Sequence, residues 1–393
     1  MQLFENTEIA FRHRGDNELK KAALLFRLMG NPHLVNLLGK IARTGMKMNI
    51  PLRWFVKPTI FNHFCGGENL RETKKIVDYL AKFNVGSLPD YAAESQNYVH
   101  EKGSVINEII NTMDFALKHS SVSFSVFKPS ALAPADVLAK ADPFNNLAED
   151  EIKGIEKFRN NIRTICQTAG ERGVPVMIDA EEFHYQHIVD RVAEEMMELY
   201  NKEKAIVFTT LQMYRHDRLD YLNKLLDDAR QKKYFPGLKI VRGAYLEQER
   251  SRALKMGYHS PVYQDKKGTD NAFNSAISIC LKNIDITNLF AGTHNEESLL
   301  FLVKKMKDYK LKRDDPRIFV SQLYGMSDHI SFNMASQSYN VAKYLPYGPI
   351  KILVPYLIRR AEENKAVTGQ AGRELALIKK EIKRRKSTKP EKQ

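Results

Sequence analysis

The chain has 393 residues, of which 43% are apolar, and carries a formal net charge of +14. This length suits one large or two ordinary domains with a sizeable core, and the charge predicts an anionic partner such as a membrane surface, a nucleic acid or an acidic substrate. No segment approaches the roughly 18 continuous apolar residues of a membrane span, and three scattered cysteines predict buried free thiols and argue against a zinc site.

The first part of the chain, residues 1–82, is predicted to be a basic helical region. Segments 19–29 and 33–44 have helix periodicity, and Pro51 interrupts it. The N-terminal residues lack the basic and then apolar pattern of a signal peptide, and their acidic residues are atypical of a transit peptide. We therefore expect a bacterial cytoplasmic protein at the inner membrane, with the mitochondrial inner membrane as the alternative.

From residue 83 onward, short apolar or β-branched runs alternate with longer amphipathic segments. This alternation is typical of parallel βαβ units, and it favours an α/β fold with a (β/α)8 barrel over residues 83–375. The predicted strands are Val85–Asp90, Val122–Lys128, Val174–Asp179, Ala205–Thr210, Leu238–Tyr245, Leu289–His294, Ile318–Leu323 and Asn340–Leu345.

Polar residues stand at or near the end of each predicted strand. Catalytic groups of this fold gather at the C-terminal ends of the strands, so the sequence predicts a ring of polar side chains around one mouth of the barrel. Lys128 and Asp179 close neighbouring strands, and both a structural ion pair and an anchor for an anionic substrate stay open. The residues are Asp90, Lys128, Asp179, Gln212, Gly243 with Tyr245, Thr293 with His294, Gln322 and Tyr344.

The helix predicted after the last strand has an unusual polar face. Tyr356, Arg359, Arg360 and Glu363 follow an i, i+3, i+4, i+7 spacing and therefore share one side of it. Two guanidinium groups suit bidentate binding of a small carboxylate. Taken alone, the face could also be solvated and carry an Arg–Glu pair. Its position above the polar strand ends favours an anion clamp.

Three weaker features leave alternatives open. His294 has no Ser or Cys nucleophile motif beside it, which favours a ligand hydrogen bond or a core histidine over a general base. Lys266 precedes a helix and indicates a phosphate site or a solvated loop. Glu94 lies one turn past Asp90 and could pair with a clamp arginine or be exposed. The sequence contains no G-x-G-x-x-G after a strand, so a nucleotide would be held without a Rossmann unit.

These residues resemble the motifs of the proline dehydrogenase family, in the same order and over roughly residues 64–368. The resemblance implies a distorted (β/α)8 barrel that binds FAD noncovalently at its C-terminal face. It also implies oxidation of L-proline to Δ1-pyrroline-5-carboxylate, with the electrons passed to a quinone. The matching segments are Asp90–Glu94, Phe127–Lys128, Ile178–Ala180, Lys239–Tyr245, Thr293–Asn295, Tyr344–Gly348 and Tyr356–Asn364.

The resemblance also assigns roles in substrate binding. Arg359, Arg360 and Lys128 would hold the proline carboxylate, Tyr344 and Tyr356 would pack against the ring, and Glu94 would pair with Arg359 when the site closes. Asp179 would pair with Lys128 and, like Lys239, act as a catalytic residue.

For the flavin, Lys239 stands where many bacterial members have an arginine, and in this it resembles the eukaryotic-type branch. The residues expected to bind the cofactor are Ala180, Gln212, Val241, Arg242, Gly243, Lys266, Thr293, His294 and Glu363.

The C-terminal residues, 376–393, are predicted to be a basic, disordered tail that is solvated or contacts anionic lipid. No nucleic acid is expected there, because no aromatic residues interleave with the charges. A membrane quinone as acceptor implies peripheral membrane contact. The chain is too short for a fused second dehydrogenase, so a separate pyrroline-5-carboxylate dehydrogenase would consume the product.

Two other functions stay open. A 4-hydroxyproline dehydrogenase would use the same machinery, although the Tyr344 ring should limit space and favour proline. A basic barrel could also bind an anionic ligand or a nucleic acid without catalysis.

Overall fold

A computed structural model describes residues 3–31, 39–40, 56–92, 102–141, 147–366 and 370–388. Eight parallel strands form a nearly closed barrel in the order β1-β8-β7-β6-β5-β4-β3-β2, and a bridge between Ser87 and Val122 joins the two ends. All eight predicted strands and the (β/α)8 class are confirmed. The strands are β1 (Gly86–Tyr91), β2 (Ser125–Phe127), β3 (Val176–Ile178), β4 (Val207–Gln212), β5 (Gly237–Val241), β6 (Asn288–Gly292), β7 (Ile318–Leu323) and β8 (Val341–Tyr347).

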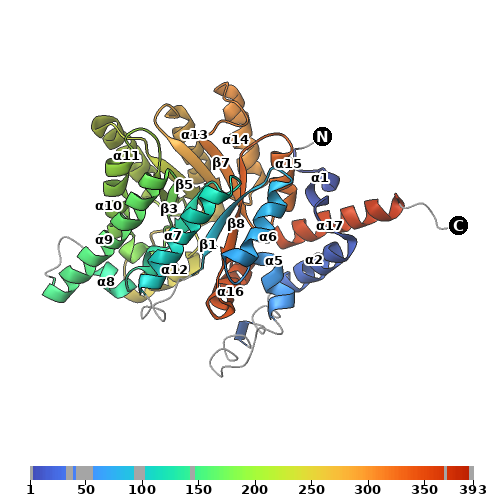
Figure 1. Ribbon diagram of the computed structural model, residues 1–393, viewed down its shortest axis with the longest axis horizontal. Helices are drawn as coiled ribbons and strands as arrows, with labels where there is room; N and C mark the ends of the chain where they lie inside the picture. The colour runs from blue at the N-terminus through green and yellow to red at the C-terminus, as the bar shows by residue number, and fades with distance from the viewer. Residues whose placement is uncertain are drawn as a thin grey trace.

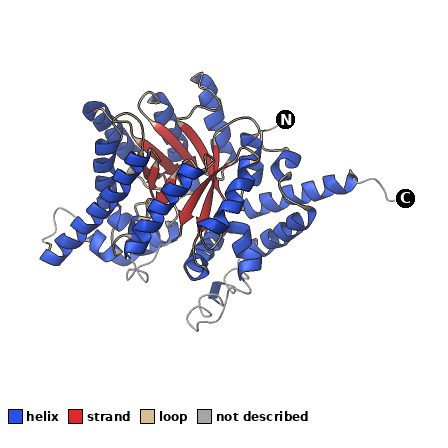
Figure 2. Cartoon of the chain, viewed as in Figure 1, coloured by secondary structure: helices blue, strands red, loops and turns tan. Residues whose placement is uncertain are grey.

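Helices surround the strands, as Figures 1 and 2 show. None of the helices among the described residues is long and apolar enough to cross a bilayer. They are α1 (Thr7–Phe11), α2 (Asp16–Met29), η1 (Lys57–Phe61), α5 (Asn62–Phe64), α6 (Leu70–Ala81), α7 (Lys102–Lys118), η3 (Pro129–Ala131), α8 (Ala135–Ala139), α9 (Glu149–Arg172), α10 (Phe183–Tyr200), α11 (Arg218–Lys232), α12 (Leu246–Met256), α13 (Lys266–Lys282), α14 (Glu296–Asp308), α15 (Asp328–Ala335), α16 (Ile350–Ala366) and α17 (Gln370–Ser387).

The inside of the barrel is layered because side chains alternate between its two faces along each strand. At the N-terminal end the Phe124 ring packs edge-on against Phe208, Phe290 and Phe319, with centroids 5.0–5.3 Å apart. Gly237 leaves room for this layer, because a Cβ there would lie 2.5 Å from the Phe208 ring. This apolar layer fills the N-terminal end of the barrel interior.

The outer faces of the strands pack against the helices in the main hydrophobic core, to which Leu238, Ile240, Leu289 and Ala291 belong. The three cysteines are free and buried, as predicted. This core fixes the strands and thereby the positions of the side chains at the mouth.

The prediction of a disordered tail over residues 376–393 is wrong as far as Ser387. Helix α17 lies beside α2 on one flank of the barrel (Figure 1). Its Leu377 and Ile378 are buried against α1 and α2. Glu381 is also buried and accepts hydrogen bonds from Arg384 and Arg385. Packing and internal ion pairs therefore order a segment whose charge density favours disorder.

Candidate active site

The mouth of the barrel holds a cluster of four charged side chains, the buried Asp90, Lys128 and Lys239 and the largely buried Asp179. Each comes from the end or inner face of a different strand. The Lys128 ammonium lies 2.8 Å from Asp90 Oδ2 and 3.7 Å from Asp179 Oδ2. Lys239 Nζ donates to Asp179 Oδ1 at 2.5 Å. The predicted pairing of Lys128 with Asp179 is therefore the longer of two contacts, and Asp90 is the closer partner.

Tyr344 of β8 completes the cluster. Its hydroxyl donates to Asp179 Oδ2 at 2.8 Å, and its ring centroid lies 4.6 Å from Lys239 Nζ. Burial, together with the negative charge of Asp179, raises the pKa of Tyr344 well above its ordinary value. The phenol therefore stays protonated and remains a hydrogen-bond donor.

The opposite charges of the cluster keep its members ionised despite their burial. Burial disfavours the Lys128 ammonium, but Asp90 and Asp179 outweigh this effect and raise the pKa of Lys128. Burial likewise disfavours the Asp179 carboxylate, yet Lys239 and Lys128 hold the pKa of Asp179 below its ordinary value. Lys128 and Asp179 are consequently charged at neutral pH, and Lys128 can accept an anionic ligand without a proton transfer.

One carboxylate oxygen of the cluster accepts no hydrogen bond from the described residues. Asp90 Oδ1 is buried and has no hydrogen-bond partner among the described residues. A buried acceptor of this kind is costly unless something donates to it. Because Asp90 is 0% exposed, only a donor enclosed within the cluster, such as a buried water molecule, could satisfy this oxygen.

Glu181 is a buried residue next to the cluster, and it holds the segment that follows Lys128. It was not identified from the sequence. Its carboxylate accepts hydrogen bonds from Ser130 N at 2.7 Å and from Ser130 Oγ at 2.6 Å, which fixes η3 directly after Lys128. Its carbonyl accepts from Gln212 Nε2 at 2.6 Å. Burial raises the pKa of Glu181 from 4.5 to about 7.

Replacing Glu181 with glutamine should flatten the pH dependence of stability. Because its folded-state pKa exceeds the unfolded value, the wild-type protein has the full contribution of this carboxyl below about pH 4.5 and loses it as the pH rises through about 7. Glutamine stays neutral, and its Oε1 can accept from Ser130 N while its Nε2 donates to Ser130 Oγ. We expect a gain of roughly 3 kcal/mol at pH 8 and little at pH 4.5, measured as urea unfolding free energies. An unchanged slope between these pH values would contradict the expectation.

The end of β5 shows close packing of the backbone. Gln212 Oε1 accepts a hydrogen bond from Ala244 N at 3.1 Å. Gly243 has φ +136, and a Cβ there would lie 2.6 Å from the Tyr214 ring. Only glycine fits this position, which brings bare backbone to the rim beside Val241. Ala180, also predicted to bind the cofactor, lies at the rim after Asp179 and is half-buried.

Arg242 points away from the barrel interior. It donates to Asp270 Oδ1 at 2.7 Å, Thr293 Oγ1 at 2.6 Å and Ser298 Oγ at 2.9 Å. Lys266 also pairs with Asp270. The structure thus brings together three predicted cofactor residues. The Asp270 carboxylate joins Arg242 to Lys266, and the guanidinium of Arg242 holds Thr293.

His294 lies beside Thr293 at the end of β6. Its Nδ1 is 2.9 Å from Ser327 Oγ, and Leu323 N approaches its Nε2 at 3.5 Å. Gln322 lies outside the mouth, because it faces α15 and its amide accepts a hydrogen bond from Ser331 Oγ.

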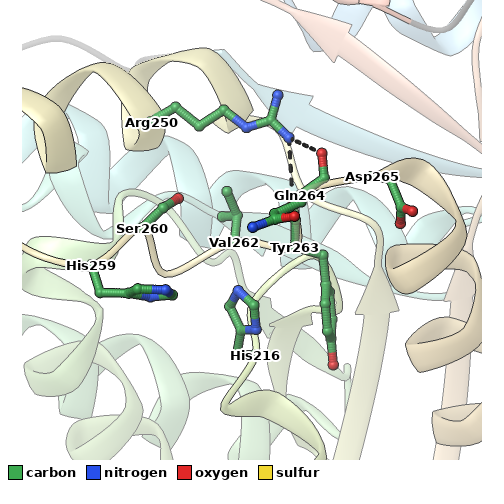
Figure 3. A pocket seen from close by; sticks show the side chains of 8 residues that line it. All are labelled: His216, Arg250, His259, Ser260, Val262, Tyr263, Gln264 and Asp265. Carbon is green, nitrogen blue, oxygen red and sulfur yellow. Dashed lines mark hydrogen bonds between the residues drawn. The ribbon is translucent and has the colours of Figure 1, made fainter.

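An open cavity of about 730 Å³ adjoins the start of α13, and Figure 3 shows its lining. His216, from the loop after β4, faces the segment that joins α12 to α13. Arg250 donates to the carbonyls of Tyr263 and Gln264 and so braces that segment. The buried Ser260 Oγ in this lining has no partner among the described residues. The volume is within the range of small-molecule sites.

The predicted clamp is only partly described. Tyr356 is buried in α16 and lies close enough to Lys128 and Tyr344 to affect their ionisation. Glu94 lies outside the described residues. Arg359, Arg360 and Glu363 belong to the described backbone of α16, but their side chains lie outside the described structure.

Comparisons with known proteins agree on one family. A family model described as proline dehydrogenase matches residues 73–373. The chain is 32% identical to mitochondrial proline dehydrogenase 1 of Dictyostelium discoideum, over 93% of this chain and 71% of that protein. It is 33% identical to the carbapenem antibiotics biosynthesis protein CarD of Pectobacterium carotovorum subsp. carotovorum, over 82% of this chain and 83% of that one.

Among solved structures, the chain is similar to proline utilization A (PutA) from Bdellovibrio bacteriovorus inactivated by N-propargylglycine. The TM-score is 0.69 at 19% identity, and the match covers 79% of this chain and 33% of that chain. The chain therefore spans about a third of the length of that PutA, and the likeness at this identity shows the barrel fold alone.

Proposed function

Since the chain belongs to the proline dehydrogenase family and is an oxidoreductase that oxidises proline, we propose that proline binds at the mouth of its barrel with the carboxylate held by Lys128, Arg359 and Arg360. The observation that carries this proposal is the buried cluster of Asp90, Lys128, Asp179 and Lys239. It offers a fixed ammonium group to an anion in a place of low dielectric, where such a contact is strong.

The remaining substrate contacts follow from the same placement. Tyr344 and Tyr356 pack against the proline ring, and Glu94 pairs with Arg359 when the site closes. Holding the carboxylate at one side of the ring aligns the carbon on the other side for oxidation, so that much of the catalysis is positioning. The product is Δ1-pyrroline-5-carboxylate.

Proline dehydrogenases are flavoenzymes, and we propose that this chain holds FAD noncovalently. The residues present suit such a group. The mouth and its rim supply donors and cations for a flavin ring and its phosphates, Gly243 permits a close backbone approach, and the buried Ser260 hydroxyl lacks a partner among the described residues. When bound, the flavin supplies the acceptor for the two electrons removed from proline. The residues proposed to hold it are Ala180, Gln212, Val241, Arg242, Gly243, Lys266, Thr293, His294 and Glu363.

In this proposal Lys239 and Asp179 act as a catalytic pair. Lys239 supplies positive charge at the mouth, and Asp179 holds both Lys239 and the Tyr344 hydroxyl in place. The hydrogen bonds of Asp179 support this role, because they fix the geometry of three side chains at once.

Anaerobic addition of L-proline tests the function directly. The purified protein should be yellow, and proline should bleach the flavin absorbance without oxygen. Arg359→Ala and Arg360→Ala should raise KM for proline while FAD stays bound. A colourless protein that binds no flavin would support the non-catalytic barrel, and near-normal kinetics of either variant would refute the clamp.

Tyr344 should make the enzyme prefer proline to 4-hydroxyproline. Its ring is buried, and its hydroxyl is tied to Asp179, so it cannot swing aside to admit an extra hydroxyl group. We expect a higher kcat/KM for proline, and Tyr344→Ser should narrow the ratio between the two substrates. Equal values in the wild-type enzyme would favour the hydroxyproline alternative.

We further propose a membrane quinone as electron acceptor and a separate pyrroline-5-carboxylate dehydrogenase as the consumer of the product. We also propose peripheral contact with an anionic membrane. Fewer basic side chains of the C-terminal segment are available for it than the sequence suggests, because Arg384 and Arg385 pair with Glu381 and Arg385 also pairs with Asp16. The mitochondrial relative from Dictyostelium discoideum supports the mitochondrial alternative for localisation. Co-sedimentation with anionic vesicles tests the membrane contact.

A further inference from the structure

His294, at the end of β6, is oriented by a neighbour from a different part of the chain. Ser327 Oγ lies 2.9 Å from its Nδ1, whereas the approach of Leu323 N to its Nε2 is at the limit of a hydrogen bond. A partner on one ring nitrogen fixes the plane of an imidazole and its tautomer, and thereby what the other nitrogen can do. The Ser327 hydroxyl therefore helps to set the orientation of the His294 ring.

Ser327 is itself held in an unusual backbone conformation. It precedes α15 with φ 52 and ψ 40, the left-handed region, which costs a residue with a Cβ about 1 kcal/mol. Such a conformation persists only where the surroundings enforce it. The neighbouring residues are tied down on both sides, because Lys343 donates to the Met326 carbonyl and pairs with Asp328 at 2.9 Å.

A further hydrogen bond to Ser327 comes from the C-terminal helix. Its backbone N–H donates to the carboxylate of Glu374 in α17, a residue only 2% exposed and 47 positions away in the sequence. Burying a carboxylate costs free energy that an apolar residue would not. For packing α17 alone, an apolar side chain would serve better. Glu374 instead meets two polar partners at the start of α15, the N–H of Ser327 and His329 Nδ1 at 3.9 Å.

We propose that Glu374 and Ser327 are positioning residues that orient His294 toward the cofactor, so that helix α17 forms part of the flavin site. This inference rests on the proposed function, in which His294 binds FAD. In the Glu374–Ser327–His294 chain, the carboxylate holds the backbone of Ser327, and the hydroxyl holds the ring of His294. Neither residue needs to touch the ligand.

Reconstitution of the apoprotein with FAD tests this chain of contacts. We measure the Kd for FAD by flavin fluorescence and the thermal unfolding of the apoprotein for each variant. Ser327→Gly removes the hydroxyl and suits the left-handed backbone, and Glu374→Ala removes the carboxylate. Each should weaken FAD binding by about tenfold, comparable with the loss caused by removing outer contacts to metal-binding histidines. Glu374→Gln keeps an acceptor oxygen and should restore binding to within about threefold of the wild type.

Two controls separate positioning from simple loss of packing. Leu377→Ala removes a buried side chain from the same helix and should lower the unfolding temperature while leaving the Kd for FAD within about twofold. Adding Ser327→Gly to His294→Ala should cause no further loss of FAD affinity, because both act through one ring. If Ser327→Gly and Glu374→Ala bind FAD as tightly as the wild type, the positioning role is wrong. Additive losses of FAD affinity in the double variant would also contradict it. In both cases the proposed function still stands. A wild-type protein that binds no FAD overturns both.

Discussion

Replacing Asp179 with asparagine is expected to lower kcat/KM for proline by roughly a hundredfold or more and to destabilise the protein by about 3–5 kcal/mol. Asp179 is the counterion of Lys239 at 2.5 Å and of Lys128 at 3.7 Å, and it accepts a hydrogen bond from the Tyr344 hydroxyl. An uncharged amide leaves two buried ammonium groups with a single carboxylate between them. Steady-state kinetics and urea unfolding measure the two effects.

The effect of Asp179→Asn on stability should depend on pH. Because the folded-state pKa of Asp179 is below its ordinary value, its contribution to stability is present above the unfolded pKa and is lost as the pH falls through the folded one. The difference in unfolding free energy between wild type and Asp179→Asn should therefore shrink on acidification.

A matched control makes the same chemical change on the surface. Asp285 pairs with Arg230 at 2.9 Å, but both side chains are exposed. Asp285→Asn should cost less than about 1 kcal/mol and leave the kinetics unchanged. Equal effects of the two substitutions would mean that the buried cluster has no special role.

Replacing Lys128 with methionine is the second change with a large expected effect. It keeps much of the side-chain volume but leaves Asp90, which is 0% exposed, without its ammonium partner at 2.8 Å. We expect a loss of roughly 3 kcal/mol in stability. If Lys128 also binds the substrate carboxylate, KM for proline should rise by at least about thirtyfold.

A second substitution separates these two roles of Lys128. Adding Asp90→Asn to Lys128→Met removes the unpaired carboxylate and should recover much of the stability. It should not recover the KM, because the cation for the substrate is still missing. Recovery of both quantities would show that Lys128 serves only as a counterion to Asp90.

The fold was predictable because its signal is local. Each strand is a short apolar or β-branched run. Eight such strands that alternate with helices are compatible with only a few fold architectures, of which the (β/α)8 barrel is one. Period-two alternation also carries information about individual side chains. Lys239 and Val241 face inward, so Arg242 must face outward, and this pattern could have predicted its network with Asp270 and Thr293.

What the sequence could not reveal depends on distant contacts. The order of α17 follows from apolar residues that meet α1 and α2 at the other end of the chain, and the surrounding lysines and arginines mask this stripe. Glu374 and Ser327 are joined only by the fold. Glu181 did leave a signal, since an acidic residue directly after Asp179 and Ala180 stands at the same mouth as they do.

The phenylalanine layer around Phe124 fills the N-terminal end of the barrel, so that its interior opens at the C-terminal mouth. We therefore expect proline, its product and the electron acceptor to use this opening one after another. An enzyme built this way completes one half-reaction before it starts the other. Initial rates at several fixed acceptor concentrations should accordingly give parallel lines in a double-reciprocal plot against proline.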